Sequence, residues 1–461
     1  MARKTVEWGG SRVSPKGISR GFGLGILGLL AGLGAPRLAA QSWALPASDP
    51  VGIARSGAGV AYGNSLEAAA LNPALLATLR DGSSAYLSAG MEIQAAQATL
   101  QSNGLVQYST DRNRFLPALG AAWRLNRSLV LGFKLDEPFL RHAQLPTTYT
   151  GRFQGQAIDL KTQRFEGQFG WSASPNWAFG ASAGLTRIQY SSDNMVRTNV
   201  GPGLMESDLH QSGAKFAPSY SLGFRWAPNS RWTVGGSYVS AIKTTLAMDA
   251  SYGAIAPTFY SLDGLGPAPV GTSAAGAAQM AGTQLRPGSG GITLPGKFTL
   301  GVRQRVNVAF TWEADVRYVL GSQTELPGYP SATPAGGTAV SGAGRSTAFR
   351  SGFGLSLMGE LNLSKNWVVR IGAALDPALR ANSDLDPLVG GAKSSGLSGG
   401  FGYRVFGGEV NVGYQFRQSE DVDRDGLDGA WSSAGLTANP ASVTRVEGMG
   451  HLWSIGYKRT F

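Results

Sequence analysis

Few residues in this sequence are arranged for catalysis. A Gly-x-Ser-x-Gly pattern occurs at 396–400, but in hydrolases that pattern turns from a strand into a helix, and here it opens a predicted strand. The 461 residues include no cysteine, which excludes thiol catalysis and thiolate metal sites. His142, His210 and His451 are far apart and lack the spacing of metal ligands. We therefore predict no enzymatic activity and no cofactor.

One acidic loop has the spacing of a calcium site. Four carboxylates follow the Asp-x-Asp-x-Asp-Gly pattern of calcium-binding loops, namely Asp421, Asp423, Asp425 and Asp428. Ser432 stands where an EF-hand needs a bidentate glutamate, which excludes an EF-hand. Two interpretations remain, a weak calcium or lipid-bridging cation site and a solvated acidic loop.

The N-terminus has the pattern of an export signal. Five cations in residues 1–20 precede an apolar run at 21–35, and small residues follow at 38–40. This order predicts a secretory signal peptide over residues 1–40, because the run is shorter than the roughly 20 residues of a membrane-spanning helix. We expect cleavage after Ala40, with Ala44 as the alternative.

The net charge of the chain is +11. Its Lys and Arg residues are scattered singly and form no cluster, so nucleic-acid binding is not predicted. Cations in a polar lumen or facing anionic lipid explain this charge better.

The strongest pattern in the chain is the alternation of apolar and polar residues. Residues 310–318 place Phe, Trp, Ala, Val and Tyr on one face and Thr, Glu, Asp and Arg on the other. Similar alternation recurs at 215–226 and 367–375 and continues to the last residue. Strands with large aromatic residues on the apolar face are typical of a transmembrane β-barrel that is apolar outside and polar inside.

The connections between these strands alternate between short and long. Tryptophan directly follows several short turns, which predicts an aromatic belt at one membrane interface. The short turns lie near 125–127, 174–176, 228–230, 306–307, 364–366 and 405–407. The long connections lie at 101–113, 141–156, 197–212, 251–292, 321–348, 378–393 and 420–449. Six short and seven long connections predict an all-β membrane protein, a 14-stranded antiparallel barrel over residues 81–461.

The final strand ends on an aromatic residue. Counting back by twos from Phe461 puts Arg459, Tyr457, Ile455 and Trp453 on the lipid side. A terminal Phe with this alternation resembles the signal that outer-membrane assembly machinery recognises, so we expect that machinery as a partner. Arg459 departs from the pattern, but a long cation near the rim reaches the interface.

Residues 41–80 do not alternate and are rich in Ala, Gly and Leu. They predict compact loops and short helices before the first strand, in the periplasm or inside the lumen. Within them, Asn72-Pro73-Ala74 resembles the Asn-Pro-Ala motif of the FadL/TodX family of outer-membrane transporters of hydrophobic compounds.

Further segments resemble the same family. Residues 54–63 are similar to its hatch, and 294–302, 312–318 and 366–373 are similar to successive strands, so the match covers nearly the whole mature chain. The charged stretch that follows is only loosely kept at 376–380.

The resemblance implies a barrel in a Gram-negative-type outer membrane, with residues 41–80 as a hatch inside the lumen. It also implies a mechanism, in which outer loops capture an apolar molecule, the lumen binds it, and hatch movement lets it leave sideways through the wall. Hydrophobic small molecules and outer-membrane lipid or lipopolysaccharide are the expected partners, and we expect a monomer. An apolar solute gains about 0.8 kcal/mol per CH₂ on leaving water, which favours such a dry path.

Four cations fall on the polar face by parity, and one of them is predicted to bind a fatty carboxylate. They are Lys134, Arg164, Arg317 and Arg370. The alternative is that they pair with lumen acids, among them Glu166, Glu313, Asp315 and Glu360.

The long connection 251–292 carries apolar residues that predict a capture groove, or else pack on one another. They include Ile255, Phe259, Tyr260, Leu262 and Leu265.

Pro138 interrupts the end of the third predicted strand. Proline cannot donate to a β-ladder, so it marks a bulge or gap. In the family the third strand is kinked at the lateral exit, which assigns Pro138 to that defect. The alternative is that the strand simply ends at its outer loop.

The sequence thus predicts an outer-membrane transporter for passive uptake of long-chain fatty acids or similar hydrophobic compounds. An aromatic or alkane hydrocarbon channel of the same fold and a hydrophilic-solute porin are the alternatives.

Overall fold

The structure is a computed structural model. It describes residues 44–63, 65–79, 82–100, 106–108, 112–145, 156–200, 203–252, 284–285, 288–326, 332–333, 345–380, 388, 390–420, 422–423 and 443–461.

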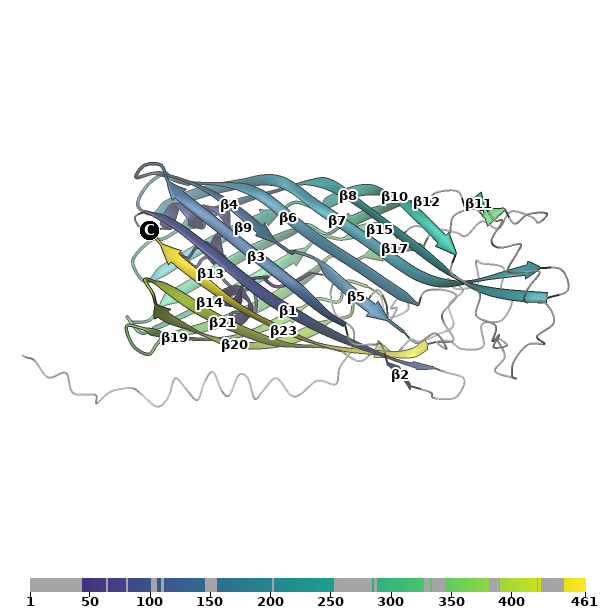
Figure 1. Ribbon diagram of the computed structural model, residues 1–461. Coiled ribbons are helices and arrows are strands. Elements are labelled where there is room, and N and C mark those ends of the chain that lie inside the picture. Colours follow the sequence, from purple (N-terminus) through teal and green to yellow (C-terminus); the bar gives the residue numbers. More distant parts are fainter. Residues whose placement is uncertain are drawn as a thin grey trace, which may run out of the picture. The chain divides into compact units, whose positions relative to one another are not determined.

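Fourteen antiparallel spanning strands close into a barrel, as the sequence predicts (Figure 1). The first and last strands pair directly, with Ser84 opposite Thr460, which closes the ring of strands. Three spans consist of two segments each, β4 with β5, β9 with β10, and β12 with β13. In chain order the spans are β1 (Ser83–Leu100), β3 (Arg112–Arg124), β4 (Leu129–Asp136) with β5 (Leu140–Gln144), β6 (Ala157–Ser172), β7 (Trp177–Val200), β8 (Gly203–Trp226), β9 (Trp232–Val239) with β10 (Ile242–Tyr252), β12 (Gly288–Leu294) with β13 (Lys297–Arg305), β14 (Phe310–Val319), β18 (Gly352–Asn362), β19 (Trp367–Asp376), β20 (Ser394–Val405), β21 (Gly408–Ser419) and β23 (Val443–Thr460).

Short strands also occur in the long connections. They are β2 (Val106–Tyr108), β11 (Gln284–Leu285), β15 (Ser322–Leu326), β16 (Ala332–Thr333), β17 (Arg345–Phe349) and β22 (Val422–Asp423). Of these, β2 and β22 join the barrel sheet, and the other four form two separate two-stranded sheets, β11 with β16 and β15 with β17. The ladder of β7 and β8 also continues to Val200 opposite Gly203, where we predicted a loop at 197–212. Residues 197–212 have no period-two apolar pattern, which is why the sequence predicted a loop there.

Three short helices lie between the N-terminal end of the described chain and β1. They are α2 (Pro50–Ala54), α3 (Leu66–Ala69) and η1 (Pro73–Thr78). Each begins at a capping side chain that accepts a backbone N–H, namely Asp49, Ser65 and Asn72. No helix among the described residues is long and apolar enough to cross a membrane.

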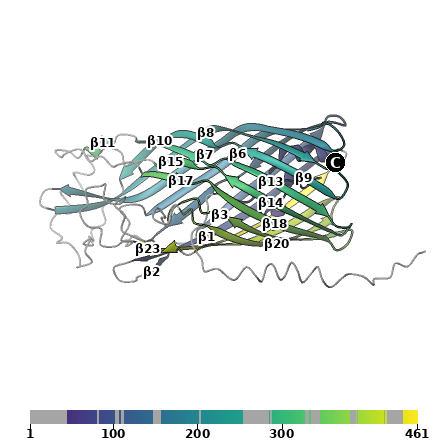
Figure 2. The ribbon, with the colours of Figure 1, turned by 180° about the vertical axis from the view of Figure 1, so that it is seen from behind.

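The outer face of the barrel carries aromatic belts. Near the short turns Trp177 stacks on Trp226, with ring centroids 5.7 Å apart. Farther along the wall Tyr238 contacts Phe298 at 4.6 Å. Figure 2 shows the opposite side of the same wall, formed by β13, β14, β18 and β20. Exposed Trp and Tyr rings of this kind are typical of the two membrane interfaces of a barrel.

Candidate functional site

Residues 44–79, here called the plug, pack against the inner face of the wall. Glycines on several strands leave room for it, because a Cβ at Gly180 would lie 2.3 Å from Ala74 N. A Cβ at Gly235 would lie 2.2 Å from Val60 O, and one at Gly413 would lie 2.1 Å from Pro50 O. Side chains at these positions would therefore displace the plug backbone.

Asn72 joins the plug to the wall through three hydrogen bonds. Its Nδ2 donates to Val60 O at 2.7 Å and to Phe224 O of β8 at 3.0 Å, while its Oδ1 accepts from Ala74 N at 3.0 Å. The side chain is fully buried. The Asn-Pro-Ala motif thus has a structural reason, since asparagine supplies both donors and the cap of η1, and Pro73 fits the first helical position.

Two acids of β14 hold a second part of the plug. Asp315 accepts the backbone N–H of Gly59 at 2.9 Å, and Glu313 accepts that of Ala61 at 2.7 Å. Both acids are fully buried. The alternative interpretation of the lumen cations paired them with these acids, whereas in the structure the two acids accept plug backbone N–H groups.

A third attachment is formed by Arg55 of the plug. Its guanidinium donates to Glu360 of β18 at 2.7 Å and lies 3.7 Å from the ring centre of Tyr62. Tyr62 also donates its hydroxyl to Glu360. Burial and the neighbouring Glu360 raise the pKa of Tyr62 to about 12, so the hydroxyl keeps its proton and remains a donor.

The wall is incomplete beside the third span. β3 pairs with β4 only over Leu119–Arg124, and β5 pairs with β6. Within the described residues no backbone pairing joins β3 to β5, so β3 before Leu119 has an unpaired edge there. Pro138 lies between β4 and β5, and Pro117 lies in the unpaired part of β3. Neither proline has an N–H, which opposes closure of the ladder.

The first residues of the plug, 44–49, lie against this gap and are here called the strap. Ala44 forms an isolated antiparallel bridge with Phe139, and Leu45 N donates to Pro138 O at 3.0 Å. Ser48 exchanges two hydrogen bonds with the backbone of Glu137. The strap therefore supplies part of the pairing that the wall lacks.

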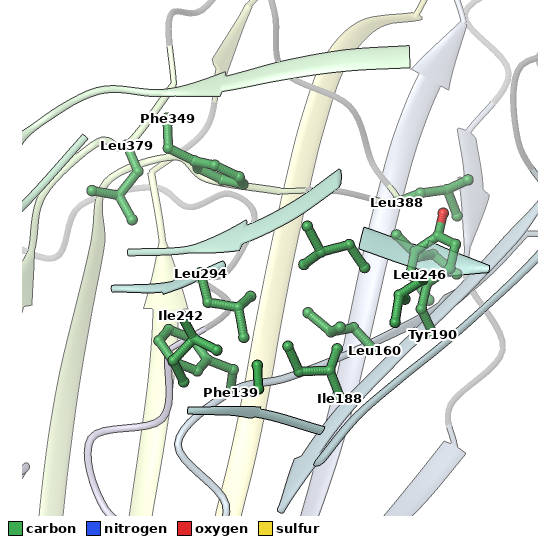
Figure 3. Close-up of a cluster of buried hydrophobic side chains, with 14 of the residues drawn as sticks. Phe139, Leu160, Ile188, Tyr190, Ile242, Leu246, Leu294, Phe349, Leu379 and Leu388 are labelled. Carbon is green, nitrogen blue, oxygen red and sulfur yellow. The ribbon is translucent and has the colours of Figure 1, made fainter. Parts of the chain in front are cut away.

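The lumen near the long loops is apolar, contrary to the expected polar interior. Figure 3 shows Leu160, Ile188 and Leu246 grouped together, with Ile242 and Leu294 beside them. These side chains come from β6, β7, β10 and β12 and are buried. Further along β6 the same face carries Arg164 and Glu166, so one strand face changes from apolar to charged with depth.

The four predicted carboxylate-binding cations all lie in the lumen, and each already has an acidic partner. Lys134 Nζ is 3.1 Å from Glu166. Arg164 donates to Asp136 at 2.7 Å. Arg317 is 3.0 Å from Asp376, and Arg370 is 2.9 Å from Glu360 and 3.1 Å from Glu409. The distances favour the pairing alternative. Lys134 and Arg370 pair with predicted acids, Glu166 and Glu360, whereas Arg164 and Arg317 pair with Asp136 and Asp376, which were not among the acids named.

Lys297 is a lumen cation that we did not select. It begins β13, where Phe298 faces outward and is 49% exposed, so parity turns Lys297 inward. Within the described part of the chain it has no carboxylate within ion-pairing distance. The alternation of Lys297 and Phe298 after Leu-Pro-Gly would have placed Lys297 on the lumen face, but we considered that segment only for its resemblance to the family.

A small cavity of about 70 Å³ connects these features. Its lining includes Lys297 and Arg164, Ile242 of the apolar cluster, Pro138 at the gap, and the strap. A group held beside Lys297 therefore lies next to both the apolar cluster and the gap.

Two of the predicted sites lie outside the described residues. The capture residues at 255–265 do so entirely, as do Asp421, Asp425 and Asp428 of the acidic loop. Asp423 lies in β22, opposite Arg445. Both sites stay predictions.

Strap docking is expected to weaken as pH rises. Burial, followed by the nearby Glu67, raises the pKa of Asp49 to about 6 from 3.8. Because the carboxyl of Asp49 holds its proton more tightly in the docked strap, docking is most stable below pH 4. The free energy of docking weakens as the pH rises from 4 to 6, and the loss is on the order of 3 kcal/mol once Asp49 is ionised. Asn caps helices as well as Asp does, so Asp49→Asn is expected to keep α2 and remove the pH dependence. Hydrogen-exchange protection factors of residues 50–55 at pH 5 and 7.5 test this, and equal pH dependence in both proteins would contradict it.

The comparisons identify the family. The model for outer membrane protein transport proteins (OMPP1/FadL/TodX) matches residues 34–461. The chain belongs to this family. No curated protein sequence matches the chain. Solved structures that it resembles include a FadL homologue from Pseudomonas aeruginosa, with 16% identity, coverage of 91% of this chain and 100% of that one, and a TM-score of 0.70.

The toluene transporters TbuX of Ralstonia pickettii and TodX of Pseudomonas putida are also similar in fold. TbuX is 14% identical, with 90% of this chain and 99% of that chain covered and a TM-score of 0.62. TodX is 13% identical, with 92% of this chain and 99% of that chain covered and a TM-score of 0.59. At such identities these structures support the fold alone. Membership in the FadL/TodX family makes the chain an outer-membrane transporter of hydrophobic compounds, and members of this family are transporters rather than enzymes.

Proposed function

We propose that this transporter takes up amphipathic molecules with a long apolar chain and a carboxylate, such as long-chain fatty acids. The observation that carries the proposal is the position of Lys297, a lumen cation that lies at the edge of a buried apolar cluster and has no ion-pair partner among the described residues. The cluster would hold the chain of the ligand, and Lys297 would hold its carboxylate. A hydrocarbon such as toluene would bind the apolar cluster but would form no ionic contact with Lys297.

We further propose that the ligand leaves sideways between β3 and β5. The gap is bordered by Pro117 and Pro138 and covered by the strap rather than by a neighbouring strand. Release of the strap would open the wall next to the cavity that contains Lys297. An apolar chain would then pass from the lumen into the membrane without crossing water.

The test is uptake by cells that express the protein, together with mass spectrometry of ligands extracted from it. We expect uptake of oleate, and co-purified fatty acid. Uptake of toluene alone would favour the hydrocarbon alternative, and unchanged uptake of both compounds would reject transport by this route. A steady open conductance in single-channel recordings would favour a hydrophilic-solute porin.

Loss of the Asn72 side chain is expected to loosen the plug without preventing barrel assembly. Asn72→Ala removes three buried hydrogen bonds, two to backbone carbonyls and one from the Ala74 N–H, a cost of about 2–4 kcal/mol to plug docking. We expect faster hydrogen exchange at residues 58–63 and reduced uptake. Asn126→Ala is the matched control, because Asn126 accepts two backbone N–H groups in an exposed turn. If Asn72→Ala shows faster hydrogen exchange in the plug but the same uptake as the wild type, the plug does not gate transport.

The remaining assignments are part of the same proposal. Signal cleavage after Ala40 agrees with the pairing of Ala44, which cleavage after residue 44 would remove. The outward face of the last strand, with Trp453 and Ile455 half exposed, supports recognition of Phe461 by assembly machinery.

A further inference from the structure

The space between the plug and the short turns contains arginines that have no acidic partner in the described part of the chain. A cavity of about 1050 Å³ opens there, and a second cavity of about 320 Å³ adjoins it. Both are bordered by Tyr62, Arg303 and Arg305, and the smaller is also lined by Arg225 and Arg231. We call this smaller cavity the vestibule. Four arginines from β8, β13 and one turn therefore converge on it.

This lack of partners contrasts with most of the lumen. Lys134, Arg164, Arg317, Arg370 and Arg417 each have a carboxylate within ion-pairing distance. Among the described residues, none of the four vestibule arginines has one. Arg231 and Arg305 are exposed to water, but Arg225 and Arg303 are half-buried, so their lack of a described acidic partner requires another explanation.

Two of these arginines have buried polar atoms without partners. The Nε atoms of Arg225 and Arg303 are buried and make no hydrogen bond. Arg303 also stacks on Tyr62, with 4.4 Å between the guanidinium carbon and the ring centre. A buried donor without an acceptor is unfavourable, and like charges close together repel one another. An anion would remove both penalties.

We propose that the vestibule is an anion-binding site for a single oxyanion group, a phosphate or a carboxylate. The planar guanidinium fork matches the oxygens of such groups. One side of the vestibule is plug, at Tyr62, Gly63 and Thr78, and the other is wall, at Arg225 and Arg303. A bound oxyanion therefore ties the plug to the barrel at the end opposite the strap.

Titration of the full-length protein in detergent with inorganic phosphate, at constant ionic strength, tests the site. We expect saturable binding of one phosphate and at least about tenfold weaker affinity for Arg225→Gln and for Arg303→Gln, since a charge-assisted hydrogen bond contributes about 1.5–3 kcal/mol. Arg303→Lys keeps the charge but loses the fork and is expected to bind with intermediate affinity. Arg127→Gln is the matched control, because Arg127 is an exposed short-turn arginine outside both cavities. Equal affinity in all five proteins, or no saturable binding by the wild type, would overturn the proposal.

Two further measurements complete the test. Folding of each variant is checked by its heat-modifiable migration, so that lost binding is not mistaken for lost structure. Phosphate is expected to slow hydrogen exchange at residues 58–63 in the wild type and in Arg127→Gln, but not in Arg225→Gln. Unchanged exchange in the wild type at saturating phosphate would reject the tie to the plug. If decanoate competes with phosphate, the occupant is the headgroup of an amphiphile. If decanoate does not compete, the occupant is a free oxyanion. Both results support the site.

Discussion

A disulfide between residues 44 and 139 is expected to stop uptake until it is reduced. Ala44 and Phe139 are partners in an antiparallel bridge, and such partners have Cα atoms about 4.5–5.5 Å apart, within the range that a disulfide spans. The bond formed in Ala44→Cys/Phe139→Cys would fix the strap over the gap between β3 and β5. If the ligand leaves there, we expect uptake to fall at least about tenfold, since a covalent bond replaces contacts of a few kcal/mol.

The chain suits this experiment because it contains no other cysteine. The same protein after reduction is the first control, and its uptake should return to that of the reduced starting material. Ser182→Cys/Ser221→Cys is the second, because these residues are already opposite each other in the β7–β8 ladder and their hydroxyls are 2.6 Å apart. N-terminal sequencing shows whether residue 44 is kept. Full uptake with the 44–139 bond complete by thiol assay would exclude the lateral route.

The barrel itself could be predicted because its signals are local. Alternation along each strand identifies the lipid face, and turn length identifies the two ends. The six predicted short turns separate observed strands, as at 125–128 and 406–407. In a membrane every backbone group must find a partner, so closure into a 14-stranded ring follows from the strand count.

The contacts inside the barrel could not be predicted in the same way. Gly59 and Asp315 are 256 residues apart, and Arg55 and Glu360 are 305 apart. Parity shows that a residue faces the lumen but not its depth or its neighbours, and these depend on the register of all strands between. The polar-lumen expectation failed for this reason on β6, where Leu160 and Arg164 share a face but lie in different layers.

The gap is an intermediate case. Pro138 indicated a break, because a missing N–H is a local property. That β5 pairs with β6 but not with β3, and that residues 44–49 cover the gap, depends on contacts between distant segments. The sequence therefore located the break without showing what closes it.

Replacement of Lys297 by methionine is expected to separate fatty acids from hydrocarbons. Methionine keeps an unbranched apolar stem of similar length but has no charge, so the apolar cluster should keep its shape. A charge-assisted hydrogen bond to a carboxylate contributes about 1.5–3 kcal/mol, which is roughly a tenfold to hundredfold loss of fatty-acid affinity at 1.4 kcal/mol per tenfold. Toluene has no carboxylate. If the wild type takes up toluene, Lys297→Met should take it up equally well.

Oleate binding and uptake by Lys297→Met, Lys297→Arg and Lys243→Met measure this effect. Arginine retains the charge and is expected to retain most of the affinity. Lys243 precedes the same apolar region on β10 but is exposed on the other face from buried Ile242, so its replacement should leave uptake unchanged. Equal oleate affinity in Lys297→Met and the wild type would show that the carboxylate is bound elsewhere. The paired cations would then return as candidates, but each would first have to release an acid, as Arg317 would have to release Asp376. Removing one member of a buried pair leaves an uncompensated charge, so a site built on them would lose stability together with affinity, whereas Lys297→Met should lose affinity alone.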